Sequence, residues 1–230
     1  MRSWVRSLKL FALLAALATP AVATPPQIVW VKDQLFAISA TQVLILRTIS
    51  DNHGYHQTEQ TDTFLIVRDL ATGQDISINA VERVVANSVI DVDITHYPLD
   101  NVVNPYAVRQ ELNAAPLSDP RRFHLNVEIY DDAVRASDHE GVTHYARWSD
   151  IFPSIFASLQ STRDLLPILK MEGGFDALDL DGFLHPVGCE VVAAANTRYI
   201  STIDTMLVQL ACEDEEVGAR HLIWFVLPAA

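Results

Sequence analysis

The sequence has few basic residues, few glycines and almost no cysteine. Its 16 Lys and Arg residues stand against 29 Asp and Glu, which gives a formal net charge of −13. This excess of acid disfavours nucleic-acid binding, because a protein that tracks phosphates needs a basic surface. With only 8 Gly, and with 50% hydrophobic residues, the chain also differs from disordered and collagen-like proteins. The composition predicts an acidic globular protein.

Common catalytic and cofactor motifs are absent as well. The chain has no Gly-x-Ser-x-Gly nucleophile motif, no phosphate-binding glycine loop and no dinucleotide-binding fingerprint. His139, Glu140 and His144 do not match the zinc-peptidase pattern His-Glu-x-x-His, because the second histidine follows the first by five residues instead of four. We therefore expect no cofactor and favour a protein that is not an enzyme.

Residues 1–23 have the three-part pattern of a secretory signal peptide. A basic start is followed by an apolar stretch over residues 10–18 and by the small residues Ala21, Val22 and Ala23. This stretch is shorter than the about 20 residues of a membrane-spanning helix, so we expect cleavage after Ala23 instead of an uncleaved anchor. The sequence predicts an exported protein, in the periplasm of a bacterium, whose residues 24–230 form a single domain that does not span the membrane.

The chain has two cysteines, Cys189 and Cys212. If their segments are strands, Cys189 lies in phase with Val191 and Cys212 with Val208, so both thiols point to an apolar face. In an oxidising compartment, an even number of cysteines favours a structural disulfide. Two free buried thiols are the alternative. A redox-active pair is disfavoured because the chain has no Cys-x-x-Cys motif.

Segments typical of strands outnumber those typical of helices. The predicted strands are residues 43–49, 64–67, 75–78, 89–95, 124–130, 142–148, 187–194, 206–212 and 221–227. The strands over 124–130 and 142–148 are expected to form a hairpin across a polar loop at 131–141. Residues 80–87 are compatible with a short helix or a continued strand. Residues 224–227 are apolar at every position, which predicts a central strand.

Two helices are predicted. Asn104 followed by Pro105 is typical of a helix start, which predicts a short helix over residues 105–113. After Ser149, apolar residues recur at helical spacing and predict the main amphipathic helix, with Ile151, Phe152, Ile155, Phe156 and Leu159 on its buried face. Because the strands come in hairpins, we predict an α+β fold, mostly antiparallel β with this one main helix.

The long polar segment between the first two predicted strands contains the candidate binding residues His53, Tyr55 and His56. Long hairpin loops often carry recognition residues. Histidines at this spacing can also chelate Zn²⁺ or Cu²⁺ when a carboxylate lies nearby. A solvated polar loop without a function is the alternative.

Two acidic patterns resemble parts of known sites. Asp91 and Asp93 lie on one face of a predicted strand, as paired carboxylates of a glycosidase could. Residues 176–181 contain three aspartates but do not complete a calcium-binding loop, because its first and last ligand positions would be Ala177 and Gly188. Neither pattern is sufficient to predict a site.

Two interpretations of function follow from the sequence. The first is an exported module that binds a small-molecule ligand or a partner protein, which the export signal and the absent catalytic motifs favour. The second is a small extracytoplasmic hydrolase that uses a metal ion held by His53 and His56.

Overall fold

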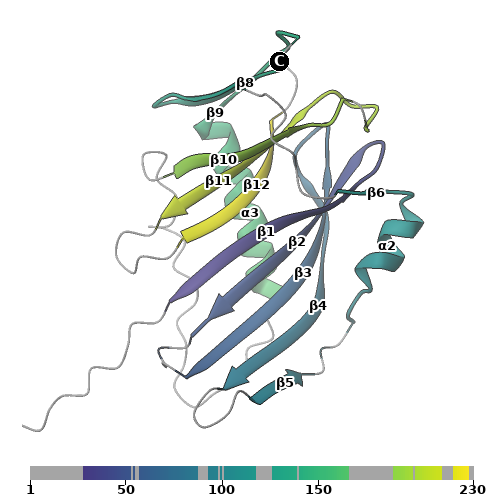
Figure 1. Ribbon diagram of the computed structural model, residues 1–230, viewed down its shortest axis with the longest axis vertical. Coiled ribbons are helices and arrows are strands. Elements are labelled where there is room, and N and C mark those ends of the chain that lie inside the picture. Colours follow the sequence, from purple (N-terminus) through teal and green to yellow (C-terminus); the bar gives the residue numbers. More distant parts are fainter. Residues whose placement is uncertain are drawn as a thin grey trace, which may run out of the picture.

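The computed structural model describes residues 28–52, 54, 57–87, 93–97, 99, 101–117, 126–138, 140–165, 189–198, 200–213 and 220–227. The predicted signal peptide, residues 1–23, lies outside this part of the chain. Within it, two mostly antiparallel sheets and two helices account for the regular structure (Figure 1). The predicted fold class, α+β with mostly antiparallel strands and one main helix, is confirmed. No helix among the described residues is both long and apolar enough to cross a membrane.

The larger sheet has nine strands. They are β1 (Val29–Ile38), β2 (Gln42–Asp51), β3 (Thr58–Asp69), β4 (Asp75–Asn87), β5 (Asp93–Tyr97), β6 (Ala115–Pro116), β10 (Cys189–Asn196), β11 (Met206–Glu213) and β12 (Arg220–Leu227). Their order is β10-β11-β12-β1-β2-β3-β4-β5, and β6 pairs with one end of β1. All pairs are antiparallel except β1 with β12, which run parallel. The apolar strand β12 lies inside the sheet, as predicted.

The first half of this sheet differs from the predictions at two places. The strand pattern did not identify β1, which begins at Val29. Of the two alternatives for residues 80–87, the continued strand is found, because these residues belong to β4. Of the predicted strand over residues 89–95, residues 93–95 are described and belong to β5. The alternation of Ile94 with polar neighbours predicts an inward side chain, but Ile94 is 56% exposed. The alternation failed there because β5 is an edge strand that pairs with β4 alone among the described strands.

The smaller sheet consists of β7 (Asn126–Ile129), β8 (Ala133–Ser137) and β9 (Thr143–Arg147). The predicted direct hairpin is wrong, because β8 lies inside the expected polar loop and pairs with both β7 and β9. Ala133, Val134 and Ala136 of β8 are buried. Polar residues on either side of this short segment mask its apolar alternation in the sequence.

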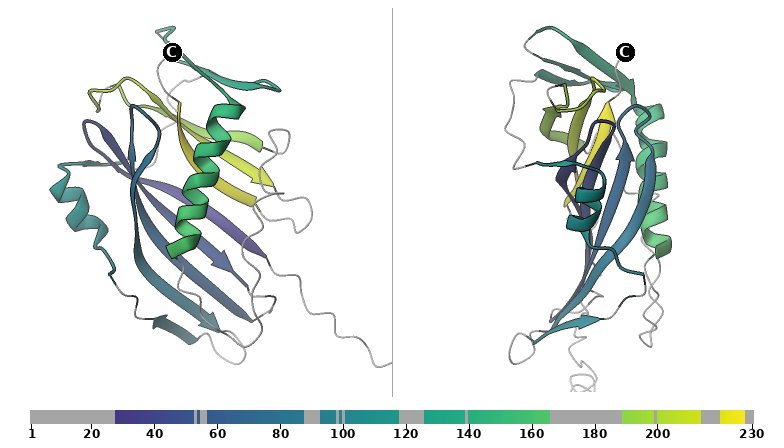
Figure 2. Two further views of the ribbon diagram at one scale, coloured as in Figure 1. Left: turned by 180° about the vertical axis from the view of Figure 1, so that it is seen from behind. Right: turned by 90° about the vertical axis from the view of Figure 1, so that its right-hand side faces the viewer.

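The two helices cover opposite faces of the larger sheet (Figure 2). The helix α2 (Pro105–Glu111) begins where predicted, and the Asn104 side chain accepts hydrogen bonds from the first-turn backbone. The helix α3 (Trp148–Leu165) buries Ile151, Ile155 and Leu159, as its periodicity predicts. This apolar stripe packs into a core between the large sheet and the small sheet.

Candidate functional site

Three arginines are buried inside the larger sheet, and each faces a carboxylate on the neighbouring strand. The pairs are Arg47 with Asp33, Arg68 with Asp75, and Arg83 with Asp62, and the members of each pair are direct register partners. The sheet itself therefore brings opposite charges together on the side that α3 covers. Charged side chains are seldom fully buried unless they are paired in this way.

The Asp33–Arg47 pair has the geometry of a two-point contact. Arg47 donates through Nε to Asp33 Oδ1 over 2.7 Å and through Nη2 to Oδ2 over 2.9 Å. Burial alone would lower the pKa of Arg47, but the charge of Asp33 and its hydrogen bonds raise that pKa above the usual arginine value. Both side chains are fully inaccessible to solvent, so the two charges compensate each other in the interior of the protein.

A β-bulge directs the second carboxylate to its arginine. Between β3 and β4 the register moves from Val67 opposite Ser77 to Arg68 opposite Asp75, which leaves Ile76 as the extra residue. Ile76 is 55% exposed, while Asp75 Oδ1 accepts a 2.6 Å hydrogen bond from Arg68 Nε. The other oxygen, Asp75 Oδ2, is buried and has no hydrogen-bond partner among the described residues.

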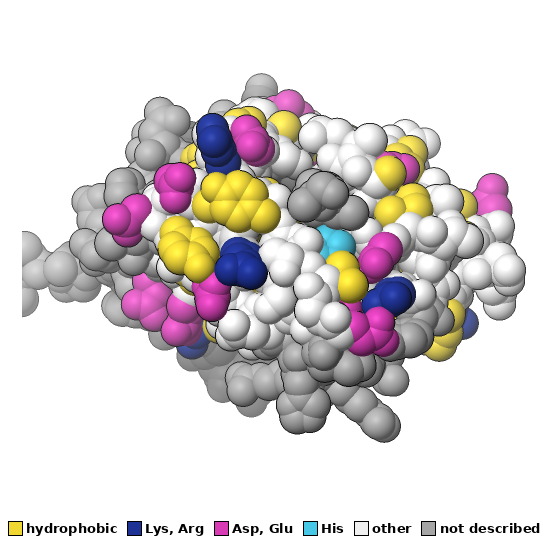
Figure 3. Space-filling model, turned by 90° about the horizontal axis from the view of Figure 1, so that it is seen from above, with side chains coloured by type: hydrophobic (Ala, Val, Ile, Leu, Met, Phe, Trp, Pro, Cys, Tyr) yellow, Lys and Arg dark blue, Asp and Glu magenta, His cyan; other side chains and the backbone are white. Residues whose placement is uncertain are grey.

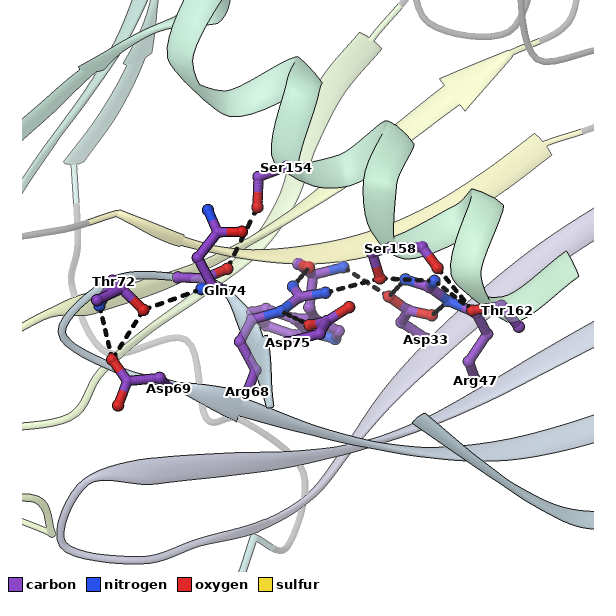
Figure 4. Close-up of polar contacts among 12 residues, drawn as sticks. Asp33, Arg47, Arg68, Asp69, Thr72, Gln74, Asp75, Ser154, Ser158 and Thr162 are labelled. Atoms are coloured by element: carbon purple, nitrogen blue, oxygen red, sulfur yellow. Dashed lines mark hydrogen bonds and ion pairs between the residues drawn. The ribbon is translucent and has the colours of Figure 1, made fainter. Parts of the chain in front are cut away.

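One row of hydroxyl groups on α3 contacts this cluster (Figure 4). Ser158 Oγ accepts hydrogen bonds from Arg47 Nη1 over 2.9 Å and from Arg68 Nη2 over 3.1 Å. Thr162 Oγ1 accepts a second bond from Arg47, and Ser154 Oγ donates to the carbonyl of Gly73. These hydroxyls are spaced four residues apart, so they lie on one side of the helix. Bonds of Ser158 and Thr162 with the arginines, and of Ser154 with the Gly73 carbonyl, thus attach three successive turns of the helix to the sheet and its β3–β4 turn.

The cluster is suited to holding elements in place. In each pair the carboxylate is engaged by a guanidinium group, which leaves no carboxylate of the three pairs without its own cation. No group of three or more His, Cys, Asp or Glu residues in the described chain is arranged to hold a metal ion. Because Arg47 and Arg68 bond to Ser158 and Thr162 of α3, two of the pairs help to position this helix.

Strand alternation in the sequence contains a signal for this cluster. Asp33 lies in phase with Val31 and Leu35, and Arg47 lies in phase with Ile45 and Ile49. A charged residue in an otherwise apolar row is unusual, and two such rows on neighbouring strands predict a buried pair.

The predicted binding residues His53, Tyr55 and His56 lie outside the described residues. Asn52 before them, Gly54 between His53 and Tyr55, and Gln57 after them are described. The Asn52 side-chain oxygen accepts hydrogen bonds from the backbone of Ile28 over 2.7 Å and of Gly54 over 3.1 Å. This contact ties the start of the segment to the beginning of β1.

The remaining sequence candidates are not brought together in the described structure. Asp91, His139 and residues 176–181 lie outside the described residues, while Asp93 is exposed on β5. His144 is fully buried on β9, as its phase with apolar neighbours predicts, and its Nε2 lies 3.9 Å from Asp204 Oδ1.

Cys189 and Cys212 form the predicted disulfide. They are direct register partners on β10 and β11, with Cα atoms 4.1 Å apart. Both residues are buried, and Cys212 also lies opposite His221 on β12. The bridge therefore cross-links the strands at one end of the larger sheet.

The outer face of the smaller sheet carries aromatic and charged side chains together. Glu128, Arg135 and Tyr145 stand opposite one another across β7, β8 and β9. Tyr130 joins them, because its hydroxyl donates a 2.6 Å hydrogen bond to Glu128 Oε2. This bond lowers the pKa of Glu128 and raises the pKa of Tyr130. Figure 3, seen from the end of the molecule where β8 and β9 lie, shows hydrophobic side chains, a class that includes Tyr, beside basic and acidic ones.

Comparison with protein-family models, with curated proteins and with solved structures found no match to this chain.

Proposed function

We propose that this protein is an exported, non-enzymatic binding module of the bacterial periplasm, and that a partner protein docks on the outer face of the smaller sheet. The observation that carries this proposal is the exposed group formed by Tyr130, Tyr145, Arg135 and Glu128. The two tyrosines are 45% and 42% exposed. Tyr and Arg are the residues that most often dominate binding energy at protein interfaces.

The group is also ordered before any partner binds. Glu128 accepts hydrogen bonds from Tyr130 and Asn126. In addition, Arg135 Nη1 lies 3.8 Å from Glu128 Oε2. Side chains that are already held in place lose less conformational entropy on binding. The inner face of the same sheet is anchored in the core through Val134 and Ala146, so the outer face rests on a rigid support.

Two features support export. The N-terminal pattern is typical of a signal peptide. The Cys189–Cys212 disulfide is in keeping with an oxidising compartment, since such bonds are rare in the cytosol of mesophiles.

A site-specific crosslinking experiment tests the proposal. A photo-crosslinking amino acid is placed at Tyr145 in the full-length protein, which is expressed in its native bacterium. The matched control places it at Ile94, a hydrophobic residue on β5 that is even more exposed and lies at the other end of the molecule (Figure 1). We expect a discrete adduct of the periplasmic protein from Tyr145 alone. The same adducts from both positions, or none from Tyr145, would argue against this docking face.

Export is tested separately by N-terminal sequencing of the native protein from the periplasmic fraction. We expect the chain to begin at Thr24. An intact N-terminus on protein found only in the cytosol would overturn the assigned compartment, independently of the crosslinking result.

A further inference from the structure

The guanidinium group of Arg109 lies beside two aromatic rings. Its central carbon is 5.5 Å from the ring centroid of Tyr106, on the same helix α2, and 5.9 Å from that of Phe36 on β1. Both distances are within the range of cation–π attraction, which extends to about 6 Å. The two rings also contact each other edge to face, with centroids 5.3 Å apart. These contacts hold the Arg109 side chain at a defined place on the surface.

The local sequence and the packing of α2 produce this arrangement. Tyr106 and Arg109 are three residues apart, so they lie on the same side of the helix. Val108 and Leu112 pack, together with Phe36, against a small core on this side of the larger sheet. The helix is thereby seated next to β1, and Arg109 meets a ring from each element.

Arg109 has no acidic partner among the described residues, in contrast to most arginines of this protein. Eight arginine side chains are described, and six of them form an ion pair with a carboxylate. These six are Arg47, Arg68, Arg83, Arg135, Arg198 and Arg220. Arg109 and Arg147 are the described arginines without such a pair. Glu111, two residues after Arg109, lies on another side of the helix.

The two unpaired arginines differ in their surroundings. Arg147 on β9 is exposed and has no ring contact in the described structure, whereas Arg109 is half-buried. The rings and the last turn of α2 attract the positive charge of Arg109. However, no described residue accepts a hydrogen bond from its guanidinium group, which has five N–H donors. Because water competes less at a half-buried group, an anion that reaches these donors is bound more strongly than at an exposed arginine.

Apolar surface adjoins these donors. The ring of Tyr106 contacts Phe36, yet Tyr106 is 60% exposed. A ligand that bonds to the guanidinium group can therefore also pack an apolar group against this ring. The planar fork of a guanidinium group matches the two oxygens of a carboxylate. A carboxylate also suits the site because it carries a single negative charge, and the net charge of −13 repels more highly charged anions.

We propose that Arg109, Tyr106 and Phe36 form a binding site for a carboxylate attached to an apolar group, as at the C-terminus of a peptide whose last residue is apolar. The carboxylate accepts hydrogen bonds from Arg109, and the apolar group packs on Tyr106. Phe36 supports the arginine from the sheet. The site is independent of the docking face proposed above, because α2 lies apart from the smaller sheet (Figure 1 and Figure 2).

NMR of the ¹⁵N-labelled mature chain tests the site, with N-acetyl-leucine as the probe. This compound carries one carboxylate beside an apolar side chain. We expect saturable shifts of the Arg109 Nε–H resonance, with a dissociation constant about tenfold lower than at Arg147, the control guanidinium within the same molecule. N-acetyl-leucine amide lacks the charge and should cause no such shift. Inorganic phosphate, an anion without an apolar group, should bind at Arg109 about tenfold more weakly than N-acetyl-leucine.

Two substitutions test the roles of the arginine and the ring, with backbone shifts of α2 as the measure of binding. Arg109→Lys keeps the charge but loses the planar fork, so the affinity for N-acetyl-leucine should fall about tenfold. Tyr106→Ala removes the exposed ring and should lower that affinity about fivefold. Arg147→Lys is the matched control and should leave binding at α2 unchanged.

Three results would overturn the site. The first is equal affinity of N-acetyl-leucine at Arg109 and Arg147. The second is equal affinity of N-acetyl-leucine and its amide. The third is phosphate that binds at Arg109 as tightly as N-acetyl-leucine, because this would show a general attraction of anions. All three comparisons use the wild type, so they remain decisive if a variant does not fold.

Discussion

Asp33 connects Arg47 to the backbone of β12. Its carboxylate binds Arg47 through both oxygens, and Oδ2 also accepts the N–H of Trp224. One side chain thus joins β2, β1 and β12. A buried ion pair of this kind stabilises a protein little more than well-packed apolar residues would. Removing one partner, however, leaves the other charge buried and uncompensated.

This asymmetry predicts the effect of Arg47→Met. The substitution leaves the Asp33 carboxylate buried without its cation, so we expect the free energy of unfolding to fall by about 3–5 kcal/mol. Urea unfolding measures it. The control is Arg135→Met, which removes an arginine whose ion pair with Glu128 is exposed and should cost about 0–1 kcal/mol. Equal losses in the two variants would contradict the positioning role of the cluster.

Ser158→Ala tests the hydroxyl row of α3. The substitution removes the acceptor that Arg47 and Arg68 share, so buried N–H groups lose a partner. We expect a loss of about 1–3 kcal/mol in unfolding free energy. Ser149→Ala, at an exposed serine in the first turn of the same helix, should change stability by less than about 0.5 kcal/mol. A Ser158→Ala variant as stable as Ser149→Ala would refute the proposed anchoring.

The disulfide predicts a stability difference that depends on redox conditions. Cys189 and Cys212 are 23 residues apart, and in the chain-entropy model closing such a loop stabilises the fold by about 3 kcal/mol. The double variant Cys189→Ala/Cys212→Ala should lose this amount in urea unfolding. A reductant that cleaves the disulfide should lower the free energy of unfolding of the wild type towards that of the variant. It should leave the free energy of unfolding of the variant unchanged. A wild type that behaves identically with and without reductant would contradict the prediction.

The turn between β3 and β4 predicts a dependence on acid. Asp69 accepts hydrogen bonds from the N–H and hydroxyl of Thr72, and these bonds, with one from Ala71, lower the pKa of Asp69. A carboxylate whose pKa is lowered by folding stabilises the fold at pH values above its pKa in the unfolded chain, which is about 3.9. This contribution is lost as the pH falls through its pKa in the folded protein.

We therefore expect wild type to exceed Asp69→Asn in unfolding free energy at about pH 7 and to lose this advantage below about pH 4. Urea unfolding at both pH values is the measurement, with Asp131→Asn, at an exposed aspartate, as control. An advantage over Asp69→Asn that persists unchanged in acid would show that the Asp69 charge does not stabilise the turn.

Local patterns predicted those elements that depend on neighbouring residues. The Asn104–Pro105 pair located the start of α2, because capping needs only a side-chain oxygen near the first-turn amides. The phase of Cys189 and Cys212 predicted their disulfide, because alternation in both strands placed the thiols on a buried face. The apolar repeat beginning at Ile151 predicted α3.

Elements that depend on distant residues were not predicted. The strand β8 is too short for its alternation to stand out, and pairing on both sides stabilises it. The bulge at Ile76 depends on the register of β3, which brings Asp75 to Arg68. The exposed group on the outer face of the smaller sheet also depends on β8, because this strand places Arg135 between Glu128 and Tyr145.

The sequence by itself determined the fold class, the cross-linked cysteines, the two helices and the acidic charge, since each follows from composition or from spacing along one segment. Only the tertiary structure decided which charges are buried. Asp33 and Arg47 are 14 residues apart, and Arg47 and Ser158 are 111 apart, so sheet register and helix packing had to bring them together. A charge can remain in an apolar layer only when such partners compensate it, and no pattern within a single segment contains that information.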